Sequence, residues 1–72
     1  MKIVKQYRSI ATHNGTTLDK THKVGHVPQL DDVVPLTAYD DDGQVSAAVY
    51  VDMFYRFVDK QDGKPLTKWV QA

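Results

Sequence analysis

The chain has 72 residues, nine basic and nine acidic side chains, a formal net charge of zero and no cysteine. This length gives one domain, residues 1–72, that is marginally stable alone, and the lack of cysteine excludes a disulfide framework and a cysteine-based zinc site. We expect no signal peptide and no membrane span, because no apolar segment is long enough. The expectation is a cytoplasmic protein stabilised by a partner or by a second copy of itself.

The composition indicates strands rather than helices. Every acidic residue is Asp and none is Glu, and valine is the commonest apolar residue. Asp favours caps and turns, and β-branched residues favour strands. The charges are uneven: residues 31–55 hold six aspartates and no lysine or arginine, whereas residues 1–30 hold five basic residues against one aspartate. Either two oppositely charged segments lie together in the fold, or the asymmetry steers a charged partner.

The first 32 residues predict one strand followed by a long loop. Residues 2–10 have no cleanly apolar face, and their Lys and Arg side chains suit an edge strand that must resist further pairing. Asn14-Gly15 is a strong turn dipeptide. Residues 11–32 carry little apolar pattern, so we expect a loop there, with a short strand at 23–27 as an option. A loop of this length is unusual in a small domain.

The second half of the chain predicts a meander. We expect three strands and two Asp-Gly turns, with strands at 36–39, 45–58 and 64–70 and turns at 40–43 and 60–63. Asp-Gly pairs between apolar runs are the strongest short-range hairpin signal. A two-residue first turn would place Leu36 opposite Val49 and Ala38 opposite Ala47.

Residues 45–60 also fit an amphipathic helix, because Ala47, Tyr50, Val51, Phe54 and Val58 form an apolar stripe of helical period. At a period of two, the odd-numbered row from 45 to 57 is wholly apolar or aromatic. Both predicted hairpins place their apolar residues on that row, and a slip of one residue would lose the agreement. We therefore predict a long strand that bends midway.

These elements predict an all-β, mainly antiparallel domain. It is a small meander of four to five strands, forming a curled sheet or a partly open barrel, with the N-terminal strand at one edge. A sheet with one apolar face needs cover. The candidates are a curl toward a barrel, the segment 11–34, or a second copy of the chain.

The even-numbered row of the central strand is the candidate contact surface. An Arg among Tyr, Phe and Trp side chains is the composition of a binding hot spot, and the acidic turn could steer a partner. A bent strand buried on both faces explains the same row without a partner. The predicted partner-binding residues are Tyr50, Phe54, Arg56 and Trp69, together with Asp40, Asp41 and Asp42.

Motifs for catalysis and for metal binding are missing from the sequence. His22 and His26 have the spacing of zinc ligands on a helix, but a glycine and a proline in that segment oppose a helix. We therefore expect surface histidines in a polar loop. Residues 40–43 lack the spacing of a calcium loop. Ser9 and Ser46 are the only serines, and neither lies in a nucleophile motif. We therefore expect that the protein is not an enzyme and that it binds no cofactor and no metal.

The sequence thus favours a non-enzymatic β module that acts by protein–protein contact. Short, cysteine-free, β-rich chains with an acidic strip occur among phage and mobile-element proteins that inhibit or assist a larger host machine, so this is one form of the prediction. A first alternative is a module that binds single-stranded nucleic acid by aromatic stacking, which the zero net charge disfavours. A second is a structural subunit whose aromatic face mediates homo-oligomerisation.

Overall fold

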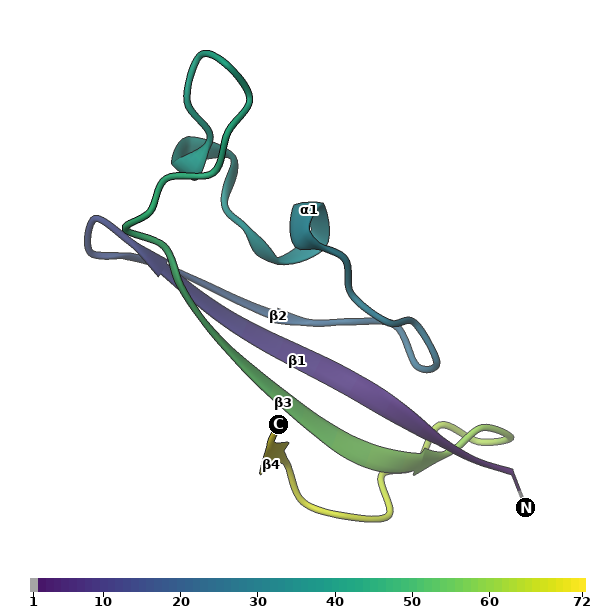
Figure 1. The fold of residues 1–72 in the computed structure, drawn as a ribbon. Coiled ribbons are helices and arrows are strands. Elements are labelled where there is room, and N and C mark those ends of the chain that lie inside the picture. Colours follow the sequence, from purple (N-terminus) through teal and green to yellow (C-terminus); the bar gives the residue numbers. More distant parts are fainter. Residues whose placement is uncertain (1) are drawn as a thin grey trace.

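Two long antiparallel strands form the centre of the molecule (Figure 1). The computed structural model describes residues 2–72. β1 (Ile3–His13) pairs with β3 (Tyr50–Asp59) in an unbroken ladder of ten residue pairs. The strand assignment for the middle of the chain is therefore confirmed over residues 50–58, and the helix alternative is wrong. The N-terminal strand was predicted at an edge, and it is instead central.

β1 is central because a second strand pairs with its other side. Asn14 and Gly15 both adopt positive φ, at 50° and 77°, as the two residues of a type I′ hairpin turn require. The chain then returns as β2 (Thr16–Thr21), in register with the end of β1. The predicted loop 11–32 is therefore wrong over these residues. The sequence did not indicate the strand because TTLDKT is polar and lacks the apolar alternation that marks a half-buried strand. The optional strand at 23–27 is also wrong, since Gly25 lies in a turn there.

β2 and β3 run in the same direction on opposite sides of β1, so the chain must cross one face of the sheet between them. Residues 22–49 make this crossing, and we call them the cover. The cover contains α1 (Leu30–Val33) and the 3₁₀ turn η1 (Leu36–Ala38), and it lies over the half of the sheet at the end of β1 (Figure 1). No helical segment within residues 2–72 combines the length and apolarity needed to span the bilayer.

The cover replaces two predicted elements. The expected strand 36–39 is mostly η1, and residues 45–49 are irregular, so β3 begins at residue 50. Tyr39 bridges Val45, whereas the predicted two-residue turn would have placed Asp40 opposite Val45. The Asp40 carboxylate accepts the backbone N–H groups of Asp42 and Gln44. This carboxylate closes a longer turn, and the predicted register is wrong for that reason.

The C-terminal hairpin keeps its predicted turn but little of its predicted strand. The Gly63 N–H donates to the Asp59 carbonyl, and the Leu66 N–H donates to the Phe57 carbonyl. Beyond Leu66 the chain bulges by two residues before β4 (Val70–Gln71) pairs with β3. The sheet therefore has the order β2-β1-β3-β4 and is open, not closed into a barrel.

The buried core is small and lies in two places. Side chains of β1 that face the cover, Ser9, Ala11 and His13, are buried. Above them, the cover contributes a cluster of Val33, Val34 and Ala38, against which Met53 of β3 packs. Val58 is the other fully buried apolar side chain, and it lies on the opposite face of the sheet.

The molecule is long for its size. It measures 46 × 20 × 15 Å, and its radius of gyration of 14.0 Å exceeds the roughly 11 Å expected for a compact chain of this length. Much apolar surface therefore stays exposed to water.

Val58 gives a test of how much stability the short core supplies. Val58→Ala removes two methyl groups from a site with 0 % exposure and should lower the free energy of unfolding by about 2 kcal/mol. Gln61→Ala, at an exposed position in the 60–63 turn, is the control and should change it by less than about 0.5 kcal/mol. Urea denaturation followed by circular dichroism measures both, and equal effects would contradict the assignment of the core.

Candidate functional site

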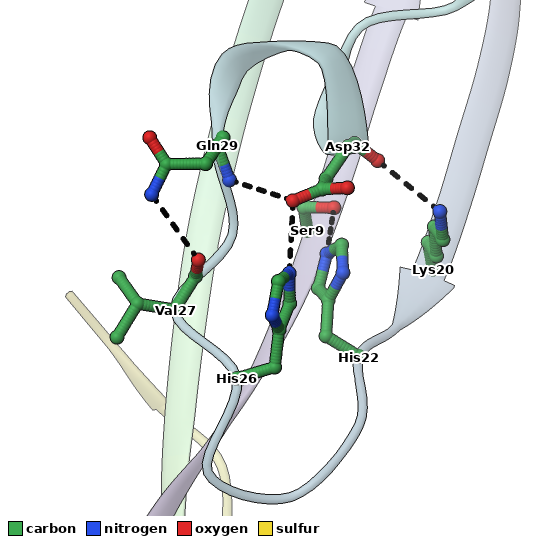
Figure 2. A network of polar contacts seen from close by, with 7 residues as sticks. All are labelled: Ser9, Lys20, His22, His26, Val27, Gln29 and Asp32. Carbon is green, nitrogen blue, oxygen red and sulfur yellow. Dashed lines mark hydrogen bonds and ion pairs between the residues drawn. The ribbon is translucent and has the colours of Figure 1, made fainter.

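Two groups of side chains have the chemistry of a functional site. One is a polar network between β1 and the cover, shown in Figure 2. The other is a set of arginine and aromatic side chains on the face of the sheet that the cover does not touch. We call that surface the open face, and the opposite surface the cover face.

The polar network begins with a buried serine–histidine pair. Ser9 Oγ lies 2.8 Å from His22 Nε2, and both side chains are buried, Ser9 at 0 % exposure. The expectation that His22 is a surface residue is therefore wrong. It is buried because His22 continues the edge pairing after β2, with its N–H donating to the Tyr7 carbonyl. Its side chain consequently lies on the cover face, beneath the cover.

A second histidine in the network, His26, contacts the carboxylate of Asp32. His26 Nε2 lies 2.9 Å from Asp32 Oδ2, and the same oxygen accepts the Gln29 N–H at the start of α1. These contacts lower the pKa of Asp32, with the backbone hydrogen bond as the larger cause and His26 as the next. Lys20 also reaches the Asp32 carbonyl oxygen from β2, at 3.4 Å (Figure 2). Asp32 thus ties α1 to both the preceding turn and the sheet edge.

The geometry of this network indicates a structural role, which is to link the cover to the sheet. A serine nucleophile needs an accessible hydroxyl and a base that is oriented by a third group. Ser9 has no exposed surface, and the carboxylate of Asp32 contacts His26 rather than His22. Within residues 2–72 no group of three or more metal-ligating side chains comes together. The network instead leaves no buried side-chain nitrogen or oxygen of the described residues without a hydrogen-bond partner.

The open face brings together three of the predicted contact residues. Arg56 stacks on Trp69, with its guanidinium carbon 4.3 Å from the ring centroid. Its Nε donates to Gln6 Oε1 at 2.9 Å, and Gln6 in turn donates to the His22 carbonyl. Phe54 lies on the same row of β3, two residues before Arg56. The sequence predicted this placement because alternation along a strand fixes the face of each side chain.

A second arginine lies on this face and was not among the predicted partner-binding residues. Arg8 lies opposite Phe54 in the β1–β3 ladder, and its guanidinium carbon is 5.9 Å from the Trp69 ring centroid. It also makes a two-pronged ion pair with Asp19 of β2, at 2.9 and 2.6 Å. This pair raises the pKa of Arg8 and lowers that of Asp19. No signal could have placed Arg8 beside Trp69 without knowledge that β1 and β3 are neighbours.

The other predicted contact residues do not contact this group. Tyr50, at the start of β3, is on the open face and 74 % exposed. Asp40, Asp41 and Asp42 are exposed in the turn that projects from the cover, far from β4 (Figure 1). The fold therefore unites Phe54, Arg56 and Trp69 but separates the acidic turn from them.

The fold also separates the charges along its length. The start of β1 and the 60–63 turn lie at one end of the sheet, and the 40–43 turn lies toward the other (Figure 1). Residues 1–8 and 56–72 together hold seven lysines and arginines against two aspartates, and residues 31–55 hold six aspartates and no basic residue. The zero net charge thus conceals a basic end and an acidic end.

Comparison with known proteins gives no further assignment, since no protein-family model, no curated protein and no solved structure matches this chain. The function therefore has to be inferred from the geometry alone.

His22 gives a pH-dependent test of the structural role of the polar network. Burial is the main cause that lowers its pKa from the ordinary value of 6.5, so between the two pKa values the unfolded chain binds more protons than the folded one. Stability should therefore be full above about pH 6.5 and fall as the pH drops below it. In His22→Gln, which cannot take up the proton, this fall should be shallower. Urea unfolding between pH 5 and 8 measures the difference, and parallel profiles for the two proteins would contradict the role of His22.

Proposed function

We propose that this protein is a non-enzymatic β module that acts by protein–protein contact through its open face. Tyr50, Phe54, Arg56 and Trp69 are the proposed anchors. The observation that carries the proposal is the stacking of Arg56 on Trp69 at 4.3 Å, on a face that the cover leaves free. Arginine, tryptophan and tyrosine are the residues most enriched at binding hot spots.

The anchors are held in place before a partner arrives. Arg56 is fixed by Gln6, which is itself fixed by the backbone at His22. Trp69 is ordered between Arg56 and Arg8, so neither side chain loses much freedom when a partner binds. Affinity benefits from such preorganisation because less entropy is lost on association. The burial of Ser9 and His22 under the cover supports the non-enzymatic part of the proposal.

The acidic turn has a different role in this proposal. Asp40, Asp41 and Asp42 lie away from the anchors, so they act at long range and steer a basic region of the partner during encounter. A role as an inhibitor or accessory protein of a larger machine stays a prediction from the sequence.

A second candidate function is supported by the charge separation. The open face carries Trp69 between two cations, with the guanidinium carbon of Arg56 at 4.3 Å and that of Arg8 at 5.9 Å from the ring centroid. Aromatic platforms among basic residues bind single-stranded nucleic acid by stacking. Such binding would weaken steeply with salt, because it releases counterions from the phosphates.

Alanine substitutions of the anchors test the first function. Trp69→Ala and Phe54→Ala should each reduce capture of the partner from a lysate of the native host by at least tenfold, which is about 1.4 kcal/mol of binding free energy. Gln61→Ala, in the exposed 60–63 turn, is the control and should leave capture unchanged. Circular dichroism verifies that each variant is folded. Unchanged capture by both folded anchor variants would overturn the proposed face.

An oligonucleotide titration separates the two candidates. Under the first function, fluorescence anisotropy of a labelled single strand of DNA should show no binding at low salt. Binding that is lost as salt rises, and lost in Trp69→Ala, would instead establish the second function.

A further inference from the structure

We propose that two copies of this chain form an antiparallel twofold dimer, cover face to cover face, in which each cover lies on the uncovered half of the partner's sheet. This inference goes beyond the contact function of the open face, because it assigns the opposite surface to a second copy. Its support comes from shape, exposed apolar surface and charge.

The cover lies over only part of the sheet (Figure 1). The cover encloses the cover face from Ser9 to His13 of β1, where the side chains are buried. On the same face Ile3 and Lys5 are exposed, and residues 22–25 of the cover lie beside this half of β1, with the N–H groups of His22 and Gly25 donating to the Tyr7 and Lys5 carbonyls. We call this region, with Tyr55, Phe57 and Leu66 beside it, the bare half. In a second copy with its long axis reversed, each cover would lie on the bare half of the other copy.

The bare half is apolar where a core would be expected. Tyr55 and Phe57 pack edge to face, with centroids 5.8 Å apart, and Lys5 lies over both rings. Beside them, Ile3, Phe57, Leu66 and Thr67 line a shallow depression of about 310 Å³. Ile3 is 57 % and Leu66 45 % exposed. A contiguous exposed apolar patch of this kind usually marks an interaction surface.

The cover presents apolar side chains that could fill this surface. Leu36 is 88 % exposed, and Leu30 and Val27 are also among the exposed large apolar residues. These side chains face water although they come from the segment that forms the core. In the proposed dimer they would lie against the bare half of the partner, and the depression would take one of them.

Charge complementarity selects a second copy as the occupant. The cover and its turn carry Asp31, Asp41 and Asp42, whereas the bare half carries Lys5 and is flanked by lysines of the terminal segments. A reversed copy therefore places acidic against basic charges twice, once at each end. A twofold interface needs such self-complementary ends, and a parallel arrangement would place like charges together.

The available area is sufficient for a stable dimer. The whole molecule extends 46 × 20 × 15 Å, so its broadest side has a footprint of at most about 900 Å². This is close to the area of about 800 Å² per partner in interfaces of standard size.

Charge reversal combined with mixing tests the proposal. We expect light scattering of the wild-type protein to give twice the mass of 8.2 kDa and to fall toward that mass on dilution. Asp41→Lys with Asp42→Lys, or Lys5→Glu with Lys64→Glu, should each weaken the dimer at least tenfold, because like charges then meet at both ends. Asp40 is left unchanged, since its carboxylate closes the turn.

Mixing the two charge-reversed proteins is the decisive step. One then carries acidic groups at both ends and the other basic groups at both ends, so a mixed dimer has opposite charges at each contact. An equimolar mixture should therefore recover the wild-type dimer mass. Asp52→Lys, which reverses a charge on the open face, is the control and should leave the dimer intact.

Three results would overturn the proposal: a wild-type protein that stays monomeric at all concentrations, a mixture that stays monomeric, or a mass that grows beyond the dimer. The last would indicate head-to-tail association. Trp69→Ala should leave the dimer mass unchanged, so loss of partner capture and loss of the dimer are distinguishable.

Discussion

The structure depends on the ten-residue ladder between β1 and β3. These strands are far apart in sequence, yet β2, which follows β1 directly, occupies the outer side of β1. The chain must then reach the far side of β1 to begin β3, and β2 and β3 run in the same direction. Strands with that relationship need a long crossover connection. The cover is this connection, and its place on one face follows from the order of the strands.

The hydrogen bonds of the polar network hold the cover against the sheet. Ser9 and Ala11 present small side chains beneath the cover, so its backbone can approach closely, and the hydroxyl of Ser9 satisfies the buried ring of His22. Asp32 fixes the start of α1 through Gln29 and His26. These contacts pair buried polar groups that would each cost about 1 to 3 kcal/mol if left unpaired.

The short cover leaves the molecule with two surfaces of different character. The open face carries arginines ordered by hydrogen bonds and stacking, which suits a partner of a different kind. The bare half of the cover face carries aliphatic and aromatic side chains near lysines, which suits the acidic cover of a second copy. A chain of this size buries too little surface to be more than marginally stable alone, so association on either surface would also stabilise the fold.

The sequence by itself determined the strand class, the three turns and the alternation that places Phe54, Arg56 and Trp69 on one face. Turn chemistry and period-two patterning are local, so they can be recognised without knowing the fold. It did not determine the partner of each strand, the polar strand β2, the burial of His22 or the place of Arg8. Only the tertiary structure decided these, because pairing between β1 and β3 joins residues that are 38 to 56 positions apart, and a side chain's surroundings depend on that pairing. The same pairing separated the charges into two ends, which a net charge of zero cannot reveal.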